Sequence, residues 1–240
     1  MKIEKYIFEE MKNVVNQIED QKAYFTRQCN ETDDIRNMKI GDKNLSLIRN
    51  IISYTLPVSY KFMDKIIWDS NREKCIVIGF NPSISTYSNI DRTNKKMIVA
   101  LDNVLSFGGY YLLNYYSIVD SDPESVLEDT YSISSMINDS YTKALIKILN
   151  HNLSNEQLSV VLMWGPTLSP EVSDKSLFDL LVKYQDLKLL HCTCKKLNDH
   201  FTFIHGSGRG VSAKNYFFPL VEKIELTEPD NLLIVSPGLT

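Results

Sequence analysis

The sequence predicts an α/β fold of three layers, in which a central parallel sheet of about four strands lies between two layers of helices. Short apolar runs alternate with longer amphipathic segments from residue 75 onward, an alternation that is typical of βαβ units. Of the 240 residues, 43% are hydrophobic, which is enough to bury one full core. We expect one α/β domain over residues 61–240, preceded by a helical extension over residues 1–60.

The helical extension is predicted from two segments. "IEKYIFEEMKNVVNQI" places apolar residues at helical spacing, and "NLSLIRNIISYTL" predicts a second helix. We expect these helices to pack on the core, and an arm that binds a partner protein is the alternative.

The apolar runs from residue 75 onward predict the strands of the sheet. Four strands are expected at residues 75–80, 110–117, 159–164 and 187–193, and a candidate hairpin strand lies at residues 200–205. Helical patterns lie between the four strands at residues 93–107, 140–150 and 174–184.

Composition narrows the class of protein. The N-terminal stretch "MKIEKYIFEEMKNVV" interrupts its apolar positions with charges, and no later run approaches the ~20 apolar residues of a membrane-spanning helix. The sequence therefore predicts a cytoplasmic protein without membrane contact.

Its four cysteines, Cys29, Cys75, Cys192 and Cys194, show no zinc-ligand spacing. We expect reduced thiols, no metal and no cofactor.

The charge balance bears on nucleic-acid binding. A net charge of −4 argues against a surface coated for indiscriminate binding of nucleic acid. Basic residues nevertheless gather at residues 91–96 and at Lys195, Lys196, Arg209 and Lys214. Taken alone, each cluster is interpreted as ordinary solvated charge.

The stretch "CIVIGFNPSIS" is the first candidate site. Its apolar run stops at Gly79 and continues as Phe80, Asn81, Pro82 and Ser83, which predicts a buried strand that ends in a rigid loop. Open α/β sheets bind ligands at the carboxyl ends of their strands. This loop is therefore expected to border a ligand.

The other strand ends add polar groups to the same edge. Asn114 is the one amide in "YYLLNYYSI", and its partner is either backbone or the polar edge of a planar ligand. Gly165 follows the third strand, and "HGSGRG" places His205 beside a glycine-rich loop that carries Arg209.

From about residue 60 to residue 220 the chain resembles a bacterial family of unknown function. The shared pattern is W-D, G-x-N-P-S, D-x-T, G-G before an apolar strand ending in Asn, D-P and W-G. Here the motifs begin at Trp68, Gly79, Asp91, Gly108, Asp122 and Trp164. The chain departs from the family where a segment containing H-P is usual, because it has His205-Gly206-Ser207 there.

Four motifs are also similar to the uracil-DNA glycosylase superfamily. "GFNPS", "LLN", "LMWG" and "HGS" occur in the superfamily's order and on the same kinds of element. The resemblance implies that the N-P loop positions a hydrolytic water, that the strand Asn reads the base, and that the final histidine supports the departing base. Residues beside that histidine are implied to wedge into DNA.

Carried onto this chain, the resemblance implies roles for named residues. Asn81 and His205 are implied to be catalytic, and Asn81 replaces an aspartate of the most active branch. Asp91 is a rival catalytic base, and the alternative is a helix N-cap. Base binding is assigned to Gly79, Phe80, Pro82, Ser83, Tyr87 and Asn114, and DNA contact to Lys195, Lys196, Ser207 and Arg209.

Three function classes follow. The first is a glycosylase that removes uracil or another altered base from DNA, flipping it out of the stack. The second is an N-glycoside hydrolase acting on a free nucleotide, which the acidic net charge favours. The third is a non-catalytic module that binds a base, DNA or a partner protein.

Overall fold

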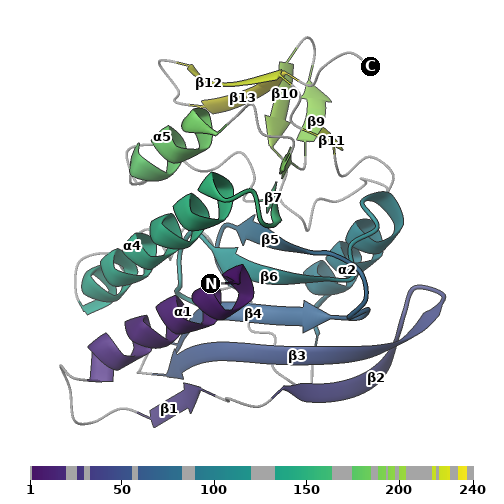
Figure 1. Cartoon of the computed structure of the whole chain (residues 1–240), viewed down its shortest axis with the longest axis vertical. Coiled ribbons are helices and arrows are strands. Elements are labelled where there is room, and N and C mark those ends of the chain that lie inside the picture. The colour runs from purple at the N-terminus through teal and green to yellow at the C-terminus, as the bar shows by residue number, and fades with distance from the viewer. Residues whose placement is uncertain are drawn as a thin grey trace.

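The computed structural model gives the chain an α/β fold built on one large mixed sheet (Figure 1). It describes residues 2–19, 26–29, 33–55, 59–82, 90–119, 133–163, 175–184, 189–192, 194–197, 200–203, 218–219, 222–227 and 232–236. Within these ranges nine strands join in the main sheet. Eight of them follow the order β1-β3-β4-β6-β5-β7-β8-β11, and the ninth, β2, pairs with residues 43–49 at the start of β3. The α/β class is confirmed.

The strands of the main sheet are β1 (Thr26–Cys29), β2 (Asp34–Ile40), β3 (Lys43–Thr55), β4 (Ser59–Ile67), β5 (Lys74–Gly79), β6 (Gly109–Asn114), β7 (Ser159–Leu162), β8 (Leu190–Cys192) and β11 (Phe218–Pro219). Parallel pairing is found in β6–β5, β5–β7 and β7–β8. The remaining pairs are antiparallel. The sheet as a whole is thus mixed rather than parallel.

Two smaller hairpins follow the main sheet in the chain. β9 (Cys194–Leu197) pairs with β10 (His200–Phe203), as expected for a hairpin strand at residues 200–205, and β12 (Glu222–Thr227) pairs with β13 (Leu232–Ser236).

The helices cover both faces of the main sheet. α1 (Ile3–Glu19), α4 (Ile133–Ser154) and α5 (Lys175–Lys183) share one core with one face, and α2 (Arg92–Val104) packs on the other. α2, α4 and α5 confirm the three helices predicted between strands. None of the described helices is long and apolar enough to cross a membrane.

The N-terminal segment is only partly helical. α1 confirms the first predicted helix, because Ile3, Ile7, Met11 and Val14 form a buried stripe at helical spacing. The second predicted helix is wrong: residues 43–55 form β3, the longest of the described strands, which pairs with both β2 and β4. Hydrogen bonding to strands on both sides outweighs the helical spacing of its apolar residues.

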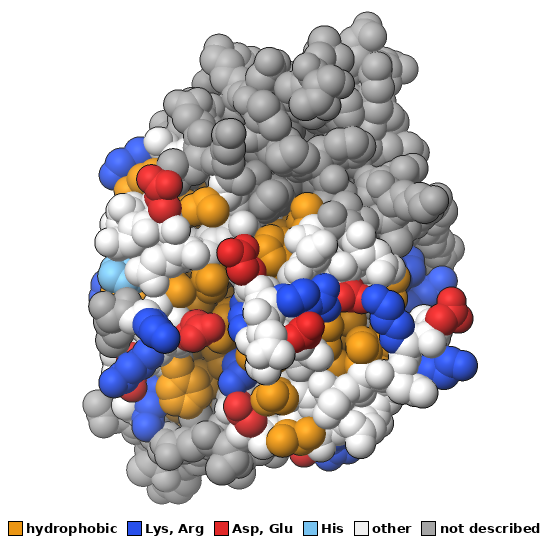
Figure 2. Space-filling model, turned by 45° about the vertical axis from the view of Figure 1, so that its right-hand side comes forward, with side chains coloured by type: hydrophobic (Ala, Val, Ile, Leu, Met, Phe, Trp, Pro, Cys, Tyr) orange, Lys and Arg blue, Asp and Glu red, His pale blue; other side chains and the backbone are white. Residues whose placement is uncertain are grey.

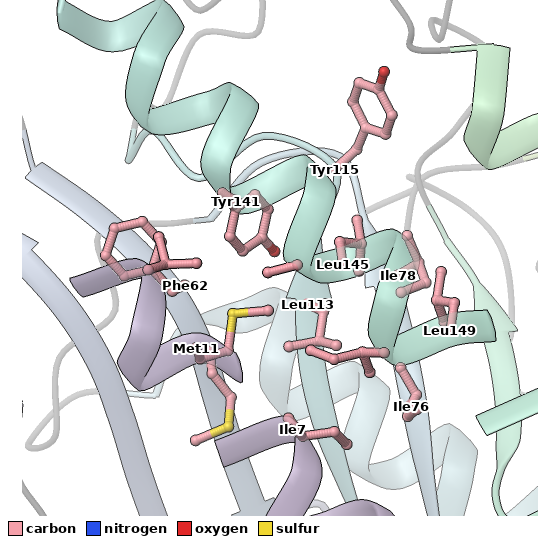
Figure 3. Packing of buried hydrophobic residues seen from close by; sticks show 14 of the residues in the cluster. Ile7, Met11, Phe62, Ile76, Ile78, Leu113, Tyr115, Tyr141, Leu145 and Leu149 are labelled. Carbon is pink, nitrogen blue, oxygen red and sulfur yellow. The ribbon is translucent and has the colours of Figure 1, made fainter. Parts of the chain in front are cut away.

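The larger core lies between the sheet and the pair α1 and α4. Ile7 and Met11 of α1 face Ile76, Ile78 and Leu113 of the parallel strands, and Tyr141, Leu145 and Leu149 of α4 complete the cluster (Figure 3). This packing fixes β5 and β6, whose ends form the candidate site.

Candidate functional site

The candidate site begins where β5 and β6 end side by side. Gly79 is in register with Asn114, and a Cβ atom on residue 79 would overlap the Oδ1 atom of Asn114. The Asn114 side chain, 4% exposed, therefore occupies space that only glycine leaves open. No hydrogen bond that the structure shows between described residues involves the Asn114 side-chain amide.

Backbone hydrogen bonds hold the start of the loop in place. The N–H groups of Tyr115 and Tyr116 donate to the carbonyl oxygens of Gly79 and Phe80, each at 2.9 Å. The hydroxyl of Tyr141, on α4, donates to the carbonyl oxygen of Asn114 at 2.6 Å. The chain entering the loop is thus rigidly attached to β6 and α4.

The predicted base-binding residues divide between the two faces of the sheet. Side chains alternate across a strand. Asn114 shares its face with Tyr110 and Leu112, which pack toward α2. Phe80 is buried on the opposite face, edge-on to Tyr116 with ring centroids 5.2 Å apart. Phe80 therefore anchors the loop in the larger core.

Asp91 caps helix α2. Its carboxylate accepts a hydrogen bond from the backbone N–H of Asn94 at 2.7 Å, with extended backbone at φ −68° and ψ 172°. The Asn94 side chain in turn accepts a hydrogen bond from the Tyr110 hydroxyl at 2.7 Å, which ties the first turn of α2 to β6. The N-cap interpretation of Asp91 is confirmed, and its catalytic role stays a prediction.

The remaining predicted site residues lie at or beyond the limits of the described chain. Asn81 is half-buried and Pro82 is buried at the end of the described loop. Lys195 and Lys196 lie on strand β9, paired with Thr202 and Phe201, and only their backbone is described. The site residues outside the described ranges are Ser83, Tyr87, Gly165, His205, Ser207 and Arg209.

A cluster of buried charges, which no sequence motif indicates, lies on the Asn114 face. We call Arg49, Lys61 and Asp64 the charged cluster; their exposed fractions are 3%, 6% and 1%. Arg49 donates to both carboxylate oxygens of Asp64, at 2.9 and 2.5 Å. Buried charges cost several kcal/mol unless they are paired, and Arg49 and Asp64 form such a pair in the sheet.

The charged cluster is linked electrostatically to Asp91. Burial lowers the pKa of Lys61, the charges of Asp64 and Asp91 act against this shift, and the charge of Arg49 adds to it. Burial together with the Asp64 and Asp91 carboxylates holds the pKa of the Tyr110 hydroxyl well above its usual range. Perturbed ionisable groups that act on one another are found at functional sites and also in structural ion-pair networks.

Other residues of the family pattern have structural roles. The backbone N–H groups of Trp68 and Asp69 both donate to the carbonyl oxygen of Gly108 at 2.9 Å, and a Cβ atom on Gly108 would overlap the carbonyl of Asp69. Arg72 bridges Asp69 and Asp102. The W-D and G-G motifs therefore join the end of β4 to the start of β6.

Charges of both signs are interspersed on the described surface that Figure 2 shows. Blue and red side chains alternate there around small apolar areas, and no broad patch of one sign covers the described part of this view. Among the described residues, no group of three or more His, Cys, Asp and Glu side chains could hold a metal ion.

Comparison with known proteins places the chain in a family. It matches the model of the family described as "Protein of unknown function (DUF1643)" over residues 62–202, more than half of the chain, and it belongs to this family. No curated protein and no solved structure matches it. The matched range contains Gly79, Asn81, Asp91 and Asn114 but ends before His205. The description names no activity, so the resemblance to uracil-DNA glycosylases stays a prediction.

Proposed function

We propose that this member of the DUF1643 family is a DNA glycosylase-like enzyme that hydrolyses the N-glycosidic bond of uracil or another altered base in DNA. The observation that carries the proposal is the Asn114 amide, buried over Gly79 at the start of the "GFNPS" loop. An amide offers a donor and an acceptor together, which suits the edge of a nucleobase. The order of the four sequence motifs supports the same proposal.

The proposed fold relationship concerns the parallel part of the sheet. The run β6-β5-β7-β8, with helices on both faces, is the part of this mixed sheet that we assign to a uracil-DNA glycosylase-like core. In open sheets of this kind ligands bind beyond the carboxyl ends of the strands. Gly79 and Asn114 both end their strands there.

The chemistry needs a pocket for the extruded base, a donor for the charge that develops on its carbonyl, and a positioned water. We assign the base edge to Asn114, the water to Asn81 and the donor to His205. An amide orients water but cannot act as a carboxylate base. Asp91 is the carboxylate that could take that role, since it follows the same loop.

DNA contact is assigned to Lys195, Lys196, Ser207 and Arg209. The net charge of −4 and the interspersed surface charges favour the alternative of a free nucleotide as substrate. Salt dependence separates the two, because phosphate contacts make DNA affinity fall steeply as salt rises. Arg209→Gln should weaken binding to all DNA sequences and reduce the slope of log affinity against log salt by about one.

The direct test incubates the protein with oligonucleotides that carry uracil, hypoxanthine or oxidised bases and then assays for abasic sites. Asn114→Ala should abolish base release, whereas Asn103→Ala removes an exposed amide at the far end of α2 and should leave it unchanged. If the wild type produces no abasic site but releases bases from free nucleotides, the alternative substrate is correct. If it does neither, the hydrolase proposal fails.

A further inference from the structure

A hollow of about 350 Å³ opens between the first two turns of α1 and the main sheet. Glu4, Lys5 and Phe8 of α1 line one side of it. Tyr111 of β6 lines the other side, together with residues of β4 and the start of β5. Pockets that bind small molecules begin at about 300 Å³. The hollow is therefore large enough for a small ligand.

The hollow is separate from the candidate site. Gly79 and Asn114 end β5 and β6, whereas Lys74, which borders the hollow, begins β5. The two places also lie on opposite faces of the sheet, because Tyr111 packs in the larger core and Asn114 lies on the face that α2 covers. A ligand in the hollow is therefore independent of the proposed function.

The floor of the hollow is apolar. Met63, Lys65 and Ile67 are two residues apart along β4, so their side chains lie on one face of the sheet. Met63, Ile67 and Tyr111 are buried, and Phe8 is partly buried against the larger core. Such a surface suits the carbon skeleton of a ligand.

Three lysines from three elements border the hollow. Lys5 comes from α1, Lys65 from β4 and Lys74 from β5. Lys65 is paired with Asp33 at 2.8 Å, whereas Lys74 donates to the neutral carbonyl oxygen of Ser70 at 2.7 Å. No ion pair that the structure shows between described residues involves Lys5 or Lys74. Each of these two ammonium groups has three donors, so both can serve a ligand.

Glu4 is the one carboxylate among the described residues that line the hollow. Burial and the charges of Glu4 and Asp33 raise the pKa of the Tyr111 hydroxyl, which also forms a hydrogen bond with Glu4. Glu4 is thus held against the wall of the hollow. Even with Asp33 included, ammonium groups outnumber carboxylates here, so the hollow favours an anion.

We infer that this hollow binds a small organic phosphate. The phosphate group lies at Lys5 and Lys74, and the carbon skeleton lies on Phe8 and Ile67. Lysine binds phosphate as a point charge. A doubly charged phosphate interacts with two ammonium groups more strongly than a singly charged carboxylate does.

The first test compares three probes on the wild-type protein by calorimetry. 1-Naphthyl phosphate joins an aromatic skeleton to a phosphate group, inorganic phosphate lacks the skeleton, and 1-naphthol lacks the phosphate. The first probe should bind at least about tenfold more tightly than either of the others, because the floor and the lysines each add contacts. Its affinity should fall as salt rises, since exposed charges are screened.

The second test places the bound probe. Lys5→Ala and Lys74→Ala should each lower the affinity for 1-naphthyl phosphate about tenfold, the worth of one charge-assisted hydrogen bond. Lys143→Ala removes an exposed lysine of α4 that does not line the hollow, so this matched control should bind like the wild type. Glu4→Gln keeps an acceptor for Tyr111 and removes a repelling charge, so it should bind more tightly.

Three results would overturn the inference: no binding of 1-naphthyl phosphate, equal binding of inorganic phosphate, or full affinity in a folded Lys5→Ala/Lys74→Ala double variant. Thermal unfolding checks that the variants fold, as expected for side chains that are not buried. The comparison of probes needs only the wild type and decides the question even if a variant fails to fold. Neither test involves base release, so the proposed function stands or falls separately.

Discussion

The side chain of Asn114 fills the space beside Gly79 in which a Cβ atom would otherwise lie. The two residues are paired neighbours at the ends of β6 and β5, so a larger side chain at residue 79 would take the space that the Asn114 side chain fills. The "GFNPS" and "LLN" motifs are separated in the chain by helix α2, and this pair joins them into a single structural unit.

The first prediction concerns this pair. Gly79→Ala should destabilise the protein by about 1–3 kcal/mol, because the added methyl group overlaps the Asn114 amide. The double variant Gly79→Ala/Asn114→Ala should recover most of this loss, which urea unfolding of the four proteins in the cycle measures. Purely additive effects would show that the two side chains do not compete for this space.

The second prediction separates the two roles of Asp91. Asp91→Ala should cost about 0.5–2 kcal/mol of stability through loss of the α2 cap, whereas Asp91→Asn keeps a good capping residue and should unfold like the wild type. If Asp91 is also the catalytic base, Asp91→Asn should lose base release while it remains fully stable. Normal release by Asp91→Asn would leave Asp91 with the capping role alone.

The third prediction concerns the proposed catalytic groups. Asn81→Ala and His205→Ala should each lower single-turnover base release by about 10²–10³-fold, the usual loss when one positioned polar group is removed. Asn81→Asp restores a carboxylate and should keep or raise activity on uracil. Intact release by both alanine variants, together with loss in Asp91→Asn, would show that the catalytic groups are misassigned.

The fourth prediction is a pH dependence of stability. Burial alone would raise the pKa of Asp102, but hydrogen bonds from Lys43 and Arg72 outweigh it and lower the pKa. The ionised carboxylate therefore stabilises the fold above the ordinary carboxyl pKa of 3.8, and this contribution is lost as the pH falls through the lowered pKa. Asp102→Asn should be less stable than the wild type at neutral pH and should approach it in acid. Urea unfolding over a pH series measures the difference, and a constant gap at all pH values would contradict it.

The strands β5, β6 and β7 can be predicted from the sequence, whereas β3 cannot. The first three are nearly continuous apolar runs because both of their faces are buried, and such runs stand out in the sequence. The sequence predicts a helix in place of β3 because Leu45, Ile48 and Ile52 also fit helical spacing. The pairing of β3 with its neighbouring strands is a tertiary contact, which local spacing does not reveal.

The charged cluster escapes prediction for a related reason. In "SYKFMDKII", strict alternation puts Lys61 and Lys65 on one face and Asp64 on the other. The pairing of β4 with β3 is irregular where the register shifts between Ile52 and Ser53, opposite Met63 and Lys61. This bulge breaks the alternation in β4 and brings Lys61 to the face of Asp64. A bulge leaves no clear trace in a single sequence.

The packing of α1 against α4 has a consequence for how the chain folds. α1 ends at Glu19 and α4 begins only at Ile133, so α1 is synthesised long before the helix it contacts. Until then the apolar stripe that includes Ile7 and Met11 lacks the helix that covers it. Contacts between such distant segments slow folding, since a long loop must close before they form. We therefore expect nascent chains that stop before α4 to expose this stripe and to depend on chaperones until synthesis has passed residue 154.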